Sequence, residues 1–265
     1  YNVFVLSQNL KNNSTVSFVN TNVTREGSAR DANVSVGQVN LFSTNGMYKL
    51  SSTVRASNVI EEEVVNGHSF TANFAKVSGL IQYDFGYWEE SDTYDPNDLG
   101  FLYNNNERGY SAGVSWNDFK GTKNFYRRDV RLGWWYAELY KPQLFASTQF
   151  NWNIGALHKK QLYANFTGNV NPFGSVDHFE SRDFGREVRF NPSAELATFF
   201  TSDYSKRFAL DGRFWFKNFF GTGQHGKGLF ISPRFRISDS WNLVLNVDVD
   251  FFNEDYGYVS PDETG

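Results

Sequence analysis

Two aspartates near the carboxyl-terminal end are the residues most suggestive of acid–base chemistry. Asp248 and Asp250 are two positions apart, so in a β-strand their carboxylates lie on the same face. Glycoside hydrolysis requires two carboxylates that face each other across a sugar. A row of structural charges is therefore the preferred interpretation, in which Asp248 and Asp250 pair across the last hairpin with Arg234 and Arg236 of the preceding strand. The chain also contains no G-x-S-x-G nucleophile motif. We expect no catalytic residue and no enzymatic activity.

Metal binding has two candidate regions. Segment 89–98, which reads E-E-S-D-T-Y-D-P-N-D, offers the hard oxygen ligands that calcium prefers, but it lacks the spacing and the glycine of an EF-hand loop. A solvated loop is the preferred interpretation, as it is for the glutamates of 61–63. The histidines are far apart, form no H-x-x-x-H pair and fall in expected loops or turns: His68, His158, His178 and His225. No metal ion or cofactor is therefore expected.

Most other charged residues alternate with apolar ones. From Asn242 the sequence reads N-L-V-L-N-V-D-V-D-F, with one wholly apolar face and one polar face on which only Val244 is apolar. Charges are too costly in hydrocarbon to face lipid at mid-depth. The pattern predicts a watery or plugged lumen lined by charges of both signs: Asp84, Asp129, Arg131, Glu195, Asp211, Arg213, Lys217, Arg234, Arg236, Asp248 and Asp250.

The opposite, apolar face is expected to contact lipid. Its candidate residues are Phe208, Leu210, Phe214, Phe216, Leu243, Leu245, Val247 and Val249. Alternation alone is also compatible with a soluble β-sandwich or propeller, whose buried face would be apolar. Aromatic clusters near strand ends and the many amide and small polar residues on the other face favour the membrane barrel.

The elements that carry these faces are about 14 strands, arranged as hairpins with short turns such as Asn45-Gly46. Longer connections at 25–32, 59–68, 89–107, 171–191 and 220–226 join the hairpins. In outer-membrane barrels short turns face the periplasm and long loops face outside. Segment 33–43 breaks the alternation, so a bulge or a shifted register is expected there. The expected strands are 1–10, 14–24, 33–43, 47–58, 69–77, 80–88, 108–118, 123–138, 143–156, 161–170, 192–202, 206–219, 227–237 and 241–253.

Composition agrees with an all-β antiparallel up-and-down transmembrane β-barrel. The 265 residues carry a formal charge of −4, which gives no basic excess for nucleic acid, and they include no cysteine for disulfides. Aromatic residues make up 18% although the mean hydropathy is −0.51. No apolar run reaches the roughly 18 residues of a membrane helix, and no signal peptide opens the chain. We expect one domain, 1–265, that is incomplete at both ends and belongs to a larger barrel.

Four segments also support a family resemblance: Pro96–Glu107, Ser202–Asp211, Ser232–Arg236 and Tyr256–Val259. They resemble a barrel family of unknown function from Bacteroidota outer-membrane proteins. In that family the barrel usually follows a module similar to family-9 carbohydrate-binding modules. The chain shows neither that module nor final strands ending in an aromatic residue. The resemblance implies an outer-membrane location in a Gram-negative bacterium.

The expected function is a pore or transport channel for polar solutes. Oligosaccharides are suggested as solutes only by the family's sugar-binding-like module. One alternative is a non-transporting barrel that supports other outer-membrane proteins in protein export or surface display. Another is the membrane anchor of a carbohydrate-binding or carbohydrate-active module. The lipid bilayer is the expected partner in all three cases, and nucleic acid in none.

Overall fold

The computed structural model describes residues 1–27, 29–98, 100–179 and 186–254. In these residues the fold is all-β, with 17 strands in one antiparallel up-and-down sheet that is not closed. The described residues include no helix with the length and apolar character needed to cross a membrane. The motif at 256–259 and part of the predicted connection 171–191 lie outside the described residues.

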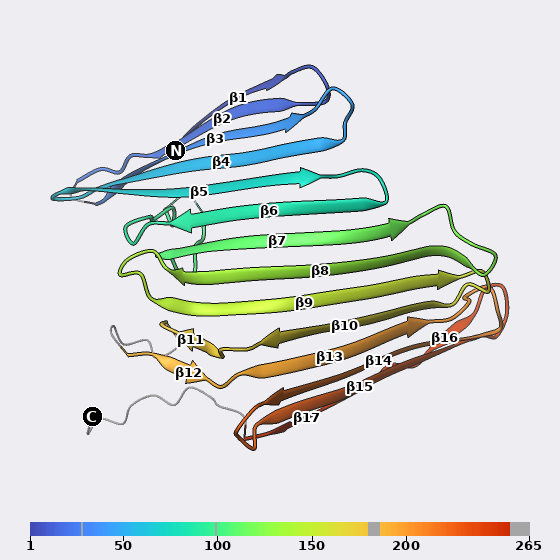
Figure 1. Ribbon diagram of the computed structural model, residues 1–265. Coiled ribbons are helices and arrows are strands. Elements are labelled where there is room, and N and C mark those ends of the chain that lie inside the picture. Colours follow the sequence, from blue (N-terminus) through green and yellow to red (C-terminus); the bar gives the residue numbers. More distant parts are fainter. Residues whose placement is uncertain (28, 99, 180–185, 255–265) are drawn as a thin grey trace. The chain divides into compact units, whose positions relative to one another are not determined.

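Most consecutive strands are joined by short turns, and a long connection follows β6 (Figure 1). Their bounds are β1 (Asn2–Asn9), β2 (Thr15–Val23), β3 (Asp31–Phe42), β4 (Tyr48–Ile60), β5 (Val64–Lys76), β6 (Ile81–Glu90), β7 (Glu107–Asp118), β8 (Phe125–Leu139), β9 (Phe145–His158), β10 (Tyr163–Asn171), β11 (Ser175–Asp177), β12 (Val188–Phe190), β13 (Ser193–Thr201), β14 (Phe208–Phe219), β15 (His225–Arg236), β16 (Asn242–Val244) and β17 (Val247–Asn253).

Each of the predicted strand segments contains a strand, and three details differ. The predicted connection 59–68 is wrong, because β4 and β5 continue to Ile60 and Val64 and only the exposed glutamates 61–63 form the turn. Valines flank these glutamates, and β-branched residues favour strands. The short strands β11 and β12 form an additional hairpin. The last predicted strand is divided into β16 and β17.

The chain divides into two compact units, and the first comprises residues 1–114 and 135–146. In it β1 to β6 pair antiparallel in chain order. One face, here called the apolar face, carries Leu50, Val54, Phe74 and Phe85, which are all exposed. The opposite face, called the polar face, includes Ser51 of β4 and its cross-strand partner Asn73.

Segment 33–43 contains no bulge, so that prediction is wrong. The pairing of β3 with both β2 and β4 is continuous. What changes along β3 is the polarity of its faces. Near Phe42 the apolar face holds Val39, whereas toward Asp31 it holds Asn33, whose amide exchanges two hydrogen bonds with Asn20, at 3.0 and 3.2 Å. On the other face Ala32 and Val34 are buried.

The second unit comprises residues 115–134 and 147–265. Its strands β9, β10 and β13 to β17 pair antiparallel in a continuous series. The register places all eight predicted lipid-facing residues on one face. This face is also called the apolar face. Apart from Leu210, which is partly buried, they are exposed: Phe208, Phe214, Phe216, Leu243, Leu245, Val247 and Val249.

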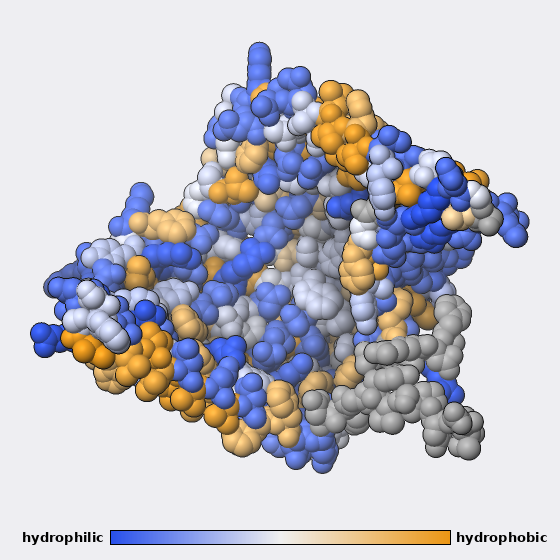
Figure 2. All heavy atoms as spheres, turned by 180° about the vertical axis from the view of Figure 1, so that it is seen from behind, coloured by the Kyte–Doolittle hydropathy of each residue, from blue (hydrophilic) through white to orange (hydrophobic). Residues whose placement is uncertain are grey.

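This apolar face is not covered by a second layer. All described strands belong to one sheet, and Val247 on the apolar face is 55% exposed. A β-sandwich would bury these side chains against another sheet. Exposed hydrophobic residues are visible as orange patches among hydrophilic residues in Figure 2. The sandwich alternative therefore does not describe this fold.

Candidate functional site

The polar face of the second unit brings together the charged residues predicted to line a lumen. Glu195 of β13 lies across from Lys217 of β14, and Arg213 of β14 lies across from Phe230 of β15. Phe230 is in turn opposite Asp248 of β17. By strand alternation the other predicted charges of these strands lie on the same face: Asp211, Arg234, Arg236 and Asp250.

Charged residues are almost excluded from the apolar face of the same strands. Within the described parts of β9, β10 and β13 to β17, Lys227 is the single Lys, Arg, Asp or Glu residue on that face. It lies near one end of β15, with its ammonium 5.9 Å from the centroid of the Phe251 ring. The two faces therefore differ in charge far more than in size of side chain.

The expected pairing of Arg234 and Arg236 with Asp248 and Asp250 across the last hairpin is wrong. Arg234 lies across from Val244, and Arg236 from Asn242. The turn before Asn242 fixes this register. The two aspartates therefore lie further from the turn, across from Phe230 and Gly228 of β15. A shared strand face thus does not make these residues neighbours.

The actual partners of the two aspartates come from β14, one strand further away. The Arg213 guanidinium is 3.9 Å from the Asp248 carboxylate, and both side chains are about half exposed. The Trp215 indole Nε1 donates a hydrogen bond of 2.8 Å to Asp250. This contact passes over Gly228, where a Cβ would lie 2.0 Å from the indole nitrogen and 1.9 Å from the carboxylate.

Arg234 and Asp211 belong to a separate cluster beside the short turn between β13 and β14. The Tyr204 hydroxyl from this turn donates to Asp211 at 2.7 Å. The Arg234 guanidinium lies 4.6 Å from the centroid of the Tyr204 ring, within the range of cation–π contacts. Arg236 donates to the Tyr204 carbonyl at 3.2 Å. These four residues fasten the turn to the polar face.

The three remaining predicted charges also lie on polar faces. A Cβ at Gly155, on the polar face of β9, would lie 2.9 Å from the Asp129 carboxylate. Arg131, two positions away on the same face, donates to the Ser115 hydroxyl at 3.2 Å. In the first unit Asp84 lies across from Ala75, two positions from Asn73 on the polar face.

Segment 91–98 folds onto the polar face of the first unit, which corrects the expectation of a solvated loop. Tyr94 is 4% exposed. The Asp95 backbone N–H donates to the Ser57 hydroxyl of β4 at 3.1 Å. Gly67 of β5 lies against the segment, since a Cβ there would be 2.3 Å from the Tyr94 Cα. The segment therefore packs against the sheet on its polar face.

Two arginines of the β2–β3 connection hold this segment. Arg25 donates to the Asp98 carboxylate at 2.7 Å, and Arg30 donates to Asp95 at 3.0 Å and also forms an ion pair with Asp98. The hydrogen bond from Arg30 is the main cause that holds the pKa of Asp98 below its ordinary value, against the opposing effect of burial. The acidic residues are thus neutralised by arginines rather than left to gather a cation.

Metal-ligand geometry is not found in the described parts of the chain, where no three His, Cys, Asp or Glu side chains are grouped to hold an ion. The histidines do not all lie in loops or turns as predicted. His68, His158 and His225 are strand residues of β5, β9 and β15. The His68 ring packs edge-on against Tyr140 with centroids 5.5 Å apart.

A row of aromatic rings crosses the apolar face of the first unit. Neighbouring ring centroids are 5.2 Å apart for Tyr87 and Tyr110, and 6.4 Å for Tyr110 and Tyr136. The hydroxyls of Tyr87 and Tyr136 donate to Glu89 and Glu138, each two residues further along its strand. One side of the row is thus apolar and the other charged. Such rows are typical of the aromatic girdle at a membrane interface.

Comparison with known proteins gives one finding about family. A family model described as a domain of unknown function (DUF5916) matches residues 1–265. No curated protein and no solved structure matches the chain.

Proposed function

We propose that this chain, which belongs to the DUF5916 family, forms part of the wall of a transmembrane β-barrel that provides an aqueous path for polar solutes. The observation that carries the proposal is the separation of charge between the faces of β13 to β17. One face exposes an apolar surface with Lys227 at its edge, and the other holds charges of both signs. A hydrocarbon environment on one side and water on the other accounts for both.

The dimensions of the strands support the proposal. Along β4 the apolar face runs from Tyr48 through Leu50 and Val54 to Ala56, and the hydrogen-bonded amide of Asn58 follows. This span matches the roughly 9–11 residues of a tilted strand that crosses a bilayer. The aromatic row of Tyr87, Tyr110 and Tyr136 would lie at the lipid–water interface.

The segment 91–98 gives the path a narrow point. Because it lies on the polar face at Ser57 and Gly67, it would reduce the open cross-section of the lumen at that level. A narrowed, mixed-charge lumen suits hydrated solutes more than apolar ones. An outer-membrane location of the chain is part of this proposal.

Reconstitution of the full chain into planar lipid bilayers tests the proposal. Discrete conductance steps in symmetric salt are expected. A chain that inserts into lipid vesicles but conducts no ions would favour the non-transporting alternative, in which the barrel supports other outer-membrane proteins. A chain that remains monodisperse in buffer without detergent would contradict both.

A further inference from the structure

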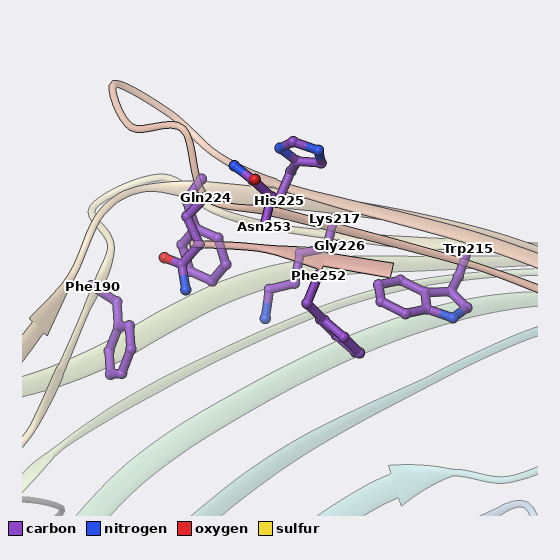
Figure 3. A pocket seen from close by; sticks show the side chains of 9 residues that line it. Phe190, Trp215, Lys217, Gln224, His225, Gly226, Phe252 and Asn253 are labelled. Carbon is purple, nitrogen blue, oxygen red and sulfur yellow. The ribbon is translucent and has the colours of Figure 1, made fainter. Parts of the chain in front are cut away.

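Four aromatic side chains surround a pocket on the otherwise polar face of the second unit. The pocket has a volume of about 250 Å³. Figure 3 shows Trp215, Lys217, Gln224 and Phe252 directed to one side of the strands, whereas the His225 ring points away from them. The four aromatic residues come from three strands and from both sides of β15: Phe190 of β12, Trp215 and Phe219 of β14, and Phe252 of β17.

The Trp215 indole is held by its own hydrogen bond, and its ring lines the pocket, where it can contact a ligand. Its Nε1 is satisfied by Asp250 at 2.8 Å. The ring lies over β15, where Gly226 has no side chain to displace it, since a Cβ there would be 2.8 Å from the indole and 3.2 Å from Phe252. The Trp215 and Phe252 centroids are 5.6 Å apart and the rings are inclined by 43°. The two rings form a concave apolar surface.

Polar groups adjoin this surface. Gln224 is 6% exposed, and its side-chain amide makes no hydrogen bond to another residue in the described part of the chain. The backbone of Gln224 is fixed at the end of the β14–β15 connection, where its carbonyl accepts a hydrogen bond of 3.1 Å from the Phe219 N–H. An amide without a partner in the protein can form hydrogen bonds with a ligand or with water in the pocket. The Lys217 ammonium lies 4.9 Å from the Phe219 ring centroid and adds further donors.

We propose that this pocket is a binding subsite for one ring of a neutral sugar within a longer oligosaccharide. The apolar faces of a sugar ring match the surface of Trp215 and Phe252, and its hydroxyls match the amide of Gln224 and the ammonium of Lys217. The volume is somewhat below the roughly 300–1,000 Å³ of pockets for whole drug-sized ligands, which suits a single ring. The inference deepens the proposed function by assigning a solute class to the wall.

The charges around the pocket favour a neutral solute. Lys217 opposes a cation at the aromatic rings, although such rings otherwise attract cations. Glu195, across from Lys217, and Asp250, bound to Trp215, oppose an anion. A purely aliphatic solute would displace water from Gln224 and Lys217 without offering hydrogen bonds in its place, which is unfavourable.

The experiment is isothermal titration of the full chain in detergent micelles with maltohexaose and with cellohexaose. We expect at least one to bind, with affinity weakened about tenfold by Trp215→Ala, the loss expected for one aromatic contact. Gln224→Leu should weaken binding severalfold while leaving all four rings in place. Trp241→Ala, at a turn tryptophan that is 68% exposed, is the matched control and should bind like the parent chain.

The outcomes separate this inference from the proposed function. A chain that conducts ions but binds neither oligosaccharide would overturn the subsite and leave the pore intact. Binding that survives both Trp215→Ala and Gln224→Leu would place the sugar elsewhere and also overturn it. Tighter binding of benzoate or choline than of either sugar would overturn the ligand class. Binding without conductance would retain the subsite and reject the pore.

Discussion

The Cα of Tyr94 lies directly against Gly67, where even a methyl group would come within 2.3 Å of it. Close approach of one backbone to another is a situation in which only glycine fits. The contact joins the segment after β6 to the polar face of β5, and the nearby Ser57 hydroxyl accepts the Asp95 N–H. Gly67 therefore determines whether segment 91–98 can lie on the wall.

Substitution of Gly67 by alanine should displace this segment. The added Cβ meets backbone atoms, which cannot move aside as a flexible side chain could, and overpacking of this kind typically costs about 1–3 kcal/mol. Backbone amides of 91–98 should then exchange with deuterium faster in mass spectrometry. Gly37→Ala is the matched control, because a Cβ at Gly37 of β3 meets nothing within 4 Å. Equal exchange in the two variants would show that Gly67 does not govern the segment.

The hold of Arg25 and Arg30 on Asp98 should depend on pH. Because the folded pKa of Asp98 is lowered, its contribution to stability is present above the ordinary pKa of an aspartate and is lost as pH falls through the lower folded pKa. Asp98→Asn removes the charge at every pH. We expect the variant to show faster exchange at 91–98 than the parent chain at neutral pH, and the difference to disappear in strong acid.

A difference that persisted unchanged into strong acid would mean that the carboxylate charge of Asp98 is not what holds the segment. Comparing two proteins at the same pH removes the intrinsic pH dependence of amide exchange from the result.

An arginine in the middle of the apolar face should prevent stable insertion. Ile231 lies on β15 midway between Phe235 and Lys227, with Val247 opposite. Ile231→Arg should cost roughly 2–4 kcal/mol at the bilayer midplane, measured by urea unfolding in lipid vesicles. Thr167→Arg on the polar face, beside Asn153 and Ala197, is the control and should cost much less. An equal loss of unfolding free energy in the two variants would show that the two faces are not exposed to different environments, lipid on one side and water on the other.

Neutralising the two β17 aspartates should change ion selectivity. If Asp248 and Asp250 line the conducting path, Asp248→Asn with Asp250→Asn leaves Arg213 without its acidic partner and shifts selectivity toward anions. The reversal potential of single channels under a salt gradient measures the shift. Asp203→Asn, in the turn between β13 and β14, provides a control remote from this row. An open channel whose selectivity is unchanged in the double variant would show that Asp248 and Asp250 do not line the pore.

The orientation of the proposed barrel can be tested by labelling, since the chain has no cysteine. Tyr103, in the long connection after β6, is 79% exposed, and Asn45 lies in the short turn between β3 and β4. With long connections outside, Tyr103→Cys should react with a membrane-impermeant maleimide on intact cells and Asn45→Cys should not. Reaction at Asn45 alone would mean that the wall is inserted the other way round.

Strand alternation was sufficient to predict which face of the sheet each side chain lies on. It did not predict the cross-strand neighbours of these side chains or the segment that packs on the polar face. Period-two patterning placed Phe214 and Val249 on one face and Arg213 and Asp248 on the other, because side-chain direction in a strand depends only on parity. The register of the last hairpin depends on the turn at 238–240, which places Arg234 across from Val244 and not beside Asp248 or Asp250, so a shared strand face alone did not predict its neighbours.

The position of segment 91–98 on the polar face could not be recognised from the polarity of its residues. Its acidic residues have the composition of a solvated loop, and their arginine partners lie more than sixty residues earlier in the chain. Gly67 lies within β5 and not in the connection predicted at 59–68, and a glycine inside a strand is a local signal of close backbone approach. The pocket at Trp215 likewise depends on Phe190 and Phe252, which sequence spacing does not bring together.

The reversal of polarity along β3 has a mechanical meaning for the proposed barrel. Where the amides of Asn20 and Asn33 form hydrogen bonds on the apolar face, the sheet of such a barrel would have left the hydrocarbon and would continue into water. Arg25 and Arg30, which hold the segment beside Gly67, follow and precede strands at this same end. The narrow point would thus be suspended from a collar outside the lipid. Changes in bilayer thickness or composition would deform the lipid-embedded part of the proposed barrel and leave the width of the narrow point at segment 91–98 unchanged.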